Sequence, residues 1–459
     1  YSYLGFAGTE PANMAKGEWA AVDSPLRADV RSKATRAAAA LGDVARAKRA
    51  ALASLPPAFD PAALRAHVEF LAAPEREGRG IGSAGLEAAG DYIATAFAKA
   101  GLAPFGADGY FQNFDVTVAG KKGPQRVRNV IGILPGSNPA FDGQSVILSA
   151  HYDHLGRDGR GVRVAELGQV HPGADDNASG VAVLLETART LASEGKPPRT
   201  IVFVAFSAEE EGLLGSKHFL ANPGKVDVAG IRSVVNLDTV GRLGTGELSV
   251  LAAGTATEWQ HVFRGISFTT GVPTRSIAGA GESSDQQSFI AQGIPAVQLF
   301  TSAHLDYHRP TDTAEKIDID GLVKISLVVK EALGYLVQRP TPLTITIDRA
   351  ALAQGAAQGG AAANGSPGAA PARRVSFGIV PDYAEAKGGV RVESVVPGSP
   401  AALAGITGGD ILQQIDGKPT ATLGAFSDVL KTLQPGQEVL ARLRRGDRDI
   451  EARVKLTER

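Results

Sequence analysis

Acidic and histidine side chains gather directly after several short apolar segments of the chain. They are His151 and Asp153 after residues 145–150, Glu209 and Glu210 after 200–206, Asp238 after 232–237, and His308 in the loop after 295–300, with Asp176 in the separate segment GADDNASG. Imidazole and carboxylate groups are the nitrogen and oxygen donors that zinc prefers. One carboxylate can also bridge two metal ions that lie roughly 3.5 to 4 Å apart. The chain has no cysteine, so any metal site must use these donors.

The spacing inside two of these clusters gives neighbouring residues different tasks. Residues two apart in a strand face the same way, so Asp153 can lie beside His151 and accept its second ring proton. Glu209 and Glu210 are consecutive and point in different directions, so one can hold a metal while the other keeps a free carboxylate for proton transfer. Each cluster alone could be a surface histidine or a set of acids at a helix N-terminus. Their joint occurrence predicts a metal site.

The elements that must position these residues are short apolar strands that alternate with helical patterns. The strands are predicted at residues 129–134, 145–150, 200–206, 232–237 and 295–300. Helices are predicted at residues 177–193, 213–221 and 319–338, with another that starts at Asp60-Pro61. This alternation predicts an α/β fold with a mostly parallel central sheet and helices on both faces. Ligands bind beyond the carboxyl ends of such strands, so the clusters are expected at one rim.

We expect four regions along the chain, with the α/β domain at residues 57–340. Residues 1–56 form an N-terminal helical extension that could be the remnant of an upstream region. Residues 341–373 form a flexible linker rich in Ala, Gly and Pro, and residues 374–459 form a small domain of short strands and turns. Because the chain begins at Tyr1 rather than at methionine, we expect that a leader or an upstream segment has been removed.

The overall charge argues against two classes of partner. The chain has 47 Lys and Arg residues against 48 Asp and Glu residues, so no bulk field draws it to nucleic acid or to an anionic membrane. No apolar run approaches the roughly 20 residues that span a bilayer. We therefore expect neither a nucleic-acid partner nor a transmembrane segment.

Five motifs, HYDHLG, GADDNASG, AEEEGLLGS, NLD and YHRPTDT, occur in one order along residues 60–340. In order and spacing this set resembles the co-catalytic di-zinc exopeptidases of metallopeptidase clan MH, which include bacterial leucine aminopeptidases and glutamate carboxypeptidases. The resemblance implies two Zn²⁺ ions and peptide substrates. By motif position, the five metal ligands would be Asp176 as the bridge, His151 and Asp238 in one site, and Glu210 and His308 in the other.

The resemblance also implies roles for residues around the metals. Glu209 would be the general base for a water that bridges the two ions, and Tyr307 would help to stabilise the tetrahedral oxyanion. Relatives hold a cis peptide after the bridging aspartate, which here is Asp176-Asn177.

Other polar residues of these motifs have less certain places. We expect His154, Asp175 and His304 to be supporting or surface groups rather than ligands, and Asp312 to orient the ligand His308. Gln286 stands where many relatives carry histidine, so the sequence does not determine the character of the pocket on that side.

The C-terminal region resembles a PDZ domain. SFGI at residues 376–379 matches the carboxylate-binding loop, and residues 395–417 match the long central signature. Such domains bind a peptide or protein C-terminus as an added strand on a sheet edge. The alternative is a structural appendage that binds no ligand.

Together these features favour a zinc-dependent aminopeptidase. Carboxypeptidase or dipeptidase action on the same metal core stays open. A glutaminyl cyclase, which works with one metal, and a receptor-like relative, which loses ligands, are less favoured because the five ligands and the base are all present. The resemblance further implies an exported bacterial enzyme, periplasmic or extracellular.

Overall fold

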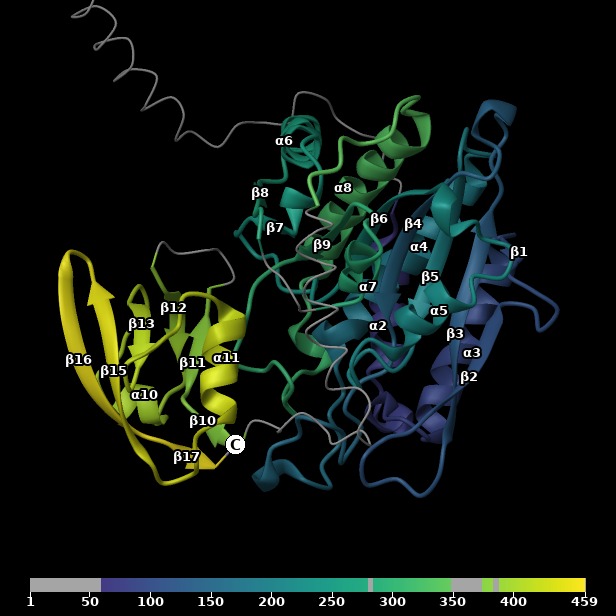
Figure 1. Cartoon of the computed structure of the whole chain (residues 1–459). Helices are drawn as coiled ribbons and strands as arrows, with labels where there is room; N and C mark the ends of the chain where they lie inside the picture. Colours follow the sequence, from purple (N-terminus) through teal and green to yellow (C-terminus); the bar gives the residue numbers. More distant parts are fainter. Residues whose placement is uncertain (1–58, 280–283, 348–373, 383–387, 459) are drawn as a thin grey trace, which may run out of the picture. The chain divides into compact units, whose positions relative to one another are not determined.

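The computed structural model describes residues 59–279, 284–347, 374–382 and 388–458 (Figure 1). These residues form a larger α/β domain and a small β-rich domain, each with a hydrophobic core of its own. The predicted N-terminal helical extension and most of the predicted linker lie outside the described residues. Backbone amides of Thr344 and Thr346 still donate to the larger domain, to Glu258 and Thr255 respectively.

A nine-stranded sheet forms the centre of the larger domain, in the order β1-β3-β5-β4-β6-β9-β7-β8 with β2 added on β3. The strands are β1 (Ala103–Pro104), β2 (Phe111–Val116), β3 (Gln125–Leu134), β4 (Ser145–His151), β5 (Thr200–Phe206), β6 (Ile231–Leu237), β7 (Leu248–Leu251), β8 (Thr274–Ser276) and β9 (Ala296–Phe300). The central strands β5, β4, β6 and β9 run parallel. β3 and β7 pair antiparallel to this central group. The predicted mostly parallel centre is confirmed, with antiparallel strands added on both sides.

Helices cover both faces of the sheet, as predicted. They are α2 (Pro61–Leu71), α3 (Ala84–Lys99), α4 (Gly180–Ser193), α5 (Leu214–Ala221), α6 (Trp259–Thr270), α7 (Gln286–Ala291) and α8 (Ile319–Gln338). Alternate side chains of β5 belong to opposite cores: Phe203 lies in the core that also contains residues of α2, α3, α4, α6 and α8, whereas Val204 lies in the core that contains residues of α5 and α7. Burial on both faces explains why β5 is apolar without interruption.

A row of buried polar side chains crosses the sheet at one level. Ser149 on β4, Asn236 on β6 and Gln298 on β9 are direct neighbours in the strand register. The Ser149 hydroxyl donates to Asn236 Oδ1 over 2.7 Å. Gln286 of α7 accepts from Asn236 over 3.1 Å and donates to Gln298 over 3.0 Å. All four side chains are buried, so Gln286 belongs to the domain interior and not to the wall of an open pocket.

The small domain is an antiparallel sheet in the order β11-β12-β13-β15-β16, with β14 on β13 and a separate β10–β17 pair. Its elements are β10 (Val375–Ser376), β11 (Ile379–Pro381), β12 (Val390–Val395), α10 (Pro400–Leu403), β13 (Ile411–Ile415), β14 (Lys418–Pro419), α11 (Leu423–Lys431), β15 (Glu438–Arg445), β16 (Arg448–Lys455) and β17 (Thr457–Glu458). Gly378, in the loop between β10 and β11, has φ +88°, and a Cβ there would lie 2.3 Å from Ser399 Oγ. Ser399 in turn donates to the Gly378 carbonyl, which holds the loop of residues 376–379.

Candidate metal centre

The candidate metal ligands lie at the carboxyl ends of the parallel strands. His151 is the last residue of β4, Glu210 follows β5, and Asp238 directly follows β6. His308 lies in the loop after β9, and Asp176 lies in the turn before α4. Because parallel strands end at the same edge of a sheet, residues that are far apart in the sequence meet at this rim.

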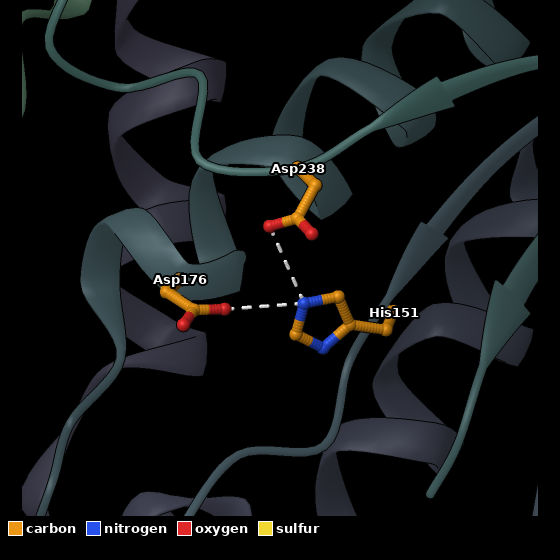
Figure 2. Close-up of side chains that lie close together, drawn as sticks. All are labelled: His151, Asp176 and Asp238. Atoms are coloured by element: carbon orange, nitrogen blue, oxygen red, sulfur yellow. Dashed lines mark ion pairs between the residues drawn. The ribbon is translucent and has the colours of Figure 1, made fainter. Parts of the chain in front are cut away.

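The first group of donors consists of His151, Asp176 and Asp238. His151 Nε2 lies 3.1 Å from Asp176 Oδ1 and 3.5 Å from Asp238 Oδ1 (Figure 2). All three side chains are buried, and together they form a set that could hold one ion.

The second group shares Asp176. His308 Nε2 lies 3.1 Å from Asp176 Oδ2 and 3.3 Å from Glu210 Oε2. The two carboxylate oxygens of Asp176 therefore face different groups, Oδ1 toward His151 and Oδ2 toward His308. This is the geometry of a bridging carboxylate.

Both groups have dimensions that suit zinc. With metal–ligand bonds of roughly 2.0 to 2.1 Å, the ligand atoms of a tetrahedral zinc site lie about 3.3 Å apart. The donor–donor separations of 3.1 to 3.5 Å at His151 and His308 match this value. The residues present thus fit two zinc ions that share Asp176.

The neighbouring charges shift protons toward the imidazoles in the metal-free protein. Burial opposes the charged form of His308, but the Glu210 and Asp176 carboxylates outweigh it and raise the pKa of His308 to about 10. Burial likewise opposes ionisation of Glu210, yet the His308 charge and a hydrogen bond from His154 lower its pKa to about 2. A metal ion would take over the positive charge that these protons supply.

Glu209 has the opposite environment from its neighbour Glu210. Burial raises the pKa of the Glu209 carboxyl well above its usual value; the Glu210 carboxylate adds to this effect and His151 opposes it. Glu209 belongs to neither donor group, so its carboxylate stays available for proton transfer, which suits a general base. The two consecutive glutamates thus differ in environment, as the sequence analysis expected.

Asp153 contacts both β4 and the loop after β5. Its carboxylate accepts the backbone N–H groups of Glu209 and Glu210 over 3.1 and 3.4 Å. His151 Nδ1 lies 3.2 Å from the Asp153 carbonyl oxygen and 3.8 Å from its carboxylate. The carboxylate thus lies beside His151 as predicted, but the shorter contact of Nδ1 is with the carbonyl, and the carboxylate also fixes the backbone of the two glutamates.

Comparison with known proteins identifies both domains. Residues 129–333 match peptidase family M28, and residues 376–456 match the PDZ domain. The larger domain therefore belongs to peptidase family M28, and the small domain is a PDZ domain. The resemblance to clan MH is confirmed at the level of the family, as is the PDZ resemblance.

The chain is similar to several named proteins. It is 30% identical to leupeptin-inactivating enzyme 1 of Streptomyces exfoliatus over 271 residues, which are 58% of this chain and 54% of that protein. It is 29% identical to aminopeptidase YwaD of Bacillus subtilis over 225 residues, 47% of this chain and 46% of that protein. The chain thus spans about half the length of the curated relatives it matches.

Solved structures share the fold of the M28 domain. BSAP, a zinc aminopeptidase from Bacillus subtilis, superimposes with a TM-score of 0.52 at 20% identity, over 64% of this chain and all of that one. A glutaminyl cyclase from Porphyromonas gingivalis gives 0.51 at 22% identity, over 61% of this chain and 99% of that one. At these identities the likeness is one of fold alone.

The turn that presents Asp176 is held from several sides in the M28 domain. Gly173 has φ +58°, residues 174–179 form a π-helical turn, and the Asp176–Asn177 peptide is cis, as the resemblance implied. Helix α4 therefore begins at Gly180, three residues later than predicted.

Asp312 stabilises this turn instead of orienting His308. Its Oδ2 accepts the backbone N–H groups of Asp175 and Asp176 over 2.9 and 3.1 Å, and its Oδ1 pairs with Arg242 over 3.2 Å. Among the described residues, His308 Nδ1 has no hydrogen-bond partner. The predicted orienting contact between Asp312 and His308 is thus wrong.

Asp175 supports the turn and does not face the metal groups. Its Oδ1 accepts the N–H of Gly241 and the hydroxyl of Ser179, over 2.5 and 3.1 Å. Its Oδ2 lies 2.9 Å from His304 Nε2. Both Asp175 and His304 are supporting residues, which agrees with the sequence analysis.

Tyr307 lies beside the metal residues with its ring stacked on the His308 imidazole, at a centroid distance of 3.9 Å and an interplanar angle of 20°. The side chain is 41% exposed. Its predicted role at the oxyanion stays a prediction.

The sequence analysis assigned no task to Arg79, which lies in the segment EGRGIGSAG at residues 77–85. Arg79 is completely buried and donates to the carbonyl groups of Tyr152, Leu71, Pro172 and Gly173 at 2.6 to 2.8 Å. The guanidinium therefore ties the segment after β4 to the segment before Asp176. Burial lowers its pKa to about 10, which leaves it charged at neutral pH. The sequence could not reveal this set of carbonyl acceptors, because every residue has a backbone carbonyl whatever its side chain.

Proposed function

We propose that the M28 domain is a zinc-dependent aminopeptidase that removes N-terminal residues from peptides. The observation that carries this proposal is the pair of donor groups that share the two oxygens of Asp176. Glu209 lies beside them with a raised pKa. In this proposal His151 and Asp238 hold one zinc ion, and His308 and Glu210 hold the other.

Two bound zinc ions would polarise the scissile carbonyl and lower the pKa of water. The remaining tasks belong to protein groups. Glu209 takes a proton from the attacking water and returns it to the leaving amine. Asp153 holds the backbone of Glu209 through the 3.1 Å hydrogen bond, and Tyr307 donates to the oxyanion.

The charges around the metal groups favour a substrate with a free α-amine over one with a free α-carboxylate. A carboxypeptidase needs a cation for the terminal carboxylate, and arginine suits that task. Three arginines in the surrounding segments are already engaged: Arg79 with four carbonyls, Arg242 with Asp312, and Arg309 with Glu166 at 2.6 Å.

Glutaminyl cyclase and a non-catalytic receptor remain the less favoured alternatives. A cyclase of this fold needs one metal, whereas the residues here fit two ions that share Asp176. A receptor needs no general base, whereas Glu209 belongs to neither donor group and stays available for proton transfer.

The test compares the full chain with Glu209→Gln on aminoacyl chromogenic amides and on N-blocked peptides. We expect two zinc ions per chain in both proteins, turnover of the free-amine substrates by the native chain only, and a loss of roughly 10²- to 10⁴-fold in Glu209→Gln. Metal binding without turnover of any free-amine substrate would exclude the aminopeptidase. A fully active Glu209→Gln chain would show that the base is another residue.

For the PDZ domain we propose that the loop of residues 376–379 and the edge strand β11 receive a peptide C-terminus. β11 pairs on one side with β12, and its placement at the end of the sheet order leaves it as an edge. Deletion of residues 374–459 should leave turnover of small amides intact. A large loss would make this domain part of the catalytic unit.

Export to the periplasm or the extracellular space stays a proposal that rests on family resemblance, and cell fractionation tests it. Among the described residues, none of the helices has the length and hydropathy needed to cross a bilayer.

A further inference from the structure

His154 lies closer to the metal groups than its sequence position suggested. It is buried, and its Nδ1 lies 2.8 Å from Glu210 Oε1 and 3.8 Å from Asp176 Oδ2. Its ring meets the His308 ring edge-on at a centroid distance of 5.6 Å. His154, Asp176 and Glu210 thus form a group that could itself hold an ion, although the ligand set proposed above contains His308 in place of His154.

The two oxygens of Glu210 have separate partners. Oε1 lies next to His154 Nδ1, whereas Oε2 lies 3.3 Å from His308 Nε2. In the tautomer that carries the ring proton on Nδ1, His154 donates this short hydrogen bond to the Glu210 carboxylate. With Nδ1 engaged as a donor, this nitrogen has no lone pair to offer to a metal.

The packing around His154 keeps its ring in this orientation. A Cβ on Gly173 would come within 2.5 Å of His154 Cδ2 and 2.6 Å of its Cγ. Glycine at position 173 therefore leaves room for the imidazole, whereas a residue with a Cβ would collide with it. His154 Nε2 is buried and has no hydrogen-bond partner among the described residues, which is consistent with the tautomer that carries its proton on Nδ1.

We propose that His154 is a positioning residue that holds Oε1 of Glu210, so that Glu210 binds the second metal through Oε2 alone. This inference rests on the proposed function. A glutamate that binds through both oxygens occupies two coordination positions, whereas one held in this way occupies a single position. The second metal keeps an open position for substrate, as catalytic zinc sites require.

The test measures zinc affinity of the metal-free full chain by competition with a chelator, for the native protein, His154→Leu and His154→Asn. The leucine variant removes the donor, whereas the asparagine amide nitrogen occupies the place of Nδ1. We expect His154→Leu to weaken the second zinc ion by roughly 10- to 100-fold, the usual cost of losing a group that orients a ligand. The first zinc ion should bind with native affinity, and His154→Asn should stay close to native at both sites.

His171→Leu is the matched control. His171 is also buried in this region, but its Nε2 lies 3.7 Å from Glu166, outside both donor groups. The control should keep native affinity for both ions. If His154→Leu does not fold, as judged by thermal unfolding without metal, His154→Gln replaces it, because the glutamine amide nitrogen takes the place of Nε2.

The outcomes separate this inference from the proposed function. A native chain that fails to bind two zinc ions overturns both. A native chain that binds two ions while His154→Leu keeps both affinities overturns the positioning role alone. Equal weakening in the leucine and asparagine variants shows that the imidazole is itself a ligand, which also overturns it.

Discussion

Replacement of Arg79 by methionine tests whether one buried cation holds the metal centre together. The guanidinium donates four hydrogen bonds to backbone carbonyls, to Leu71, Tyr152, Pro172 and Gly173. Methionine has a similar length but no donor, so Arg79→Met removes the donor from the carbonyls of Leu71, Tyr152 and Pro172, whereas the Gly173 carbonyl keeps the N–H of Ala178. Each such acceptor costs roughly 1 to 3 kcal/mol. Relief from burying a charge offsets part of this cost, and we expect a net loss of about 3 to 5 kcal/mol.

The position of these carbonyls adds a second effect. Tyr152 follows the ligand His151, and Gly173 precedes Asp176 by three residues, so the loss of Arg79 frees both segments that carry ligands of the first zinc site. We expect zinc affinity to fall by roughly 10- to 100-fold, as for other residues that orient ligands. The assays are urea unfolding of the metal-free chain and chelator competition.

Arg199→Met is the matched control. Arg199 is also buried and donates to the carbonyl groups of Leu336 and Arg339 over 2.5 and 2.8 Å. It lies at the amino end of β5, away from the metal groups. We expect this variant to lose stability and keep native zinc affinity. The reasoning fails if Arg79→Met loses less than about 1 kcal/mol, or if both variants bind zinc equally well.

Three further predictions concern the metal groups and the PDZ domain. Asp176→Ala should abolish binding of both zinc ions in a metal titration, whereas Asp175→Ala should weaken binding without abolishing it. Zinc binding at pH 7 should release protons, seen as a buffer-dependent calorimetric enthalpy, because the pKa of His308 is about 10 before the metal displaces its proton. Burial alone would raise the pKa of Asp410, but two 2.7 Å hydrogen bonds from Arg445 outweigh it and lower that pKa. A carboxyl group whose pKa is lowered by folding stabilises the folded state above its unfolded pKa of about 4. This stabilisation is lost as the pH falls through the pKa of the folded state. Asp410→Asn should therefore lower the free energy of unfolding of the PDZ domain at pH 7, and the difference from the native chain should shrink as the pH falls toward 2.

The sequence was sufficient for the parts of the molecule that depend on hydrophobic pattern and motif order. The apolar segment 200–206 matches β5 residue for residue, because a strand buried on both faces has no polar position that could blur its ends. Asp60-Pro61 marked the start of α2 through a side-chain cap, which is a local interaction. The five predicted ligands also meet at one rim, since parallel strands end together.

Interactions with backbone atoms account for most of what the sequence left out. Asp312 follows His308 by four residues, and that proximity suggested a contact between side chains. The carboxylate binds instead the backbone N–H groups of Asp175 and Asp176, more than a hundred residues away. Asp153 likewise binds the backbone of Glu209. Every residue except proline has this donor, so residue types cannot reveal which one is used.

The row formed by Ser149, Asn236 and Gln298 has a consequence for how the larger domain can be redesigned. His151 and Asp238 each stand two positions beyond a member of the row, so the strand alignment that joins Ser149 to Asn236 also places these ligands side by side. Apolar neighbours would tolerate a slipped alignment, and a slip of one residue turns every side chain to the other face. The hydrogen bonds of the row therefore favour one alignment of the strands over the slipped ones. Apolar replacement of all three residues would also leave the buried amide of Gln286 without these partners, so we expect a loss of stability together with a population of misaligned strands that binds no metal.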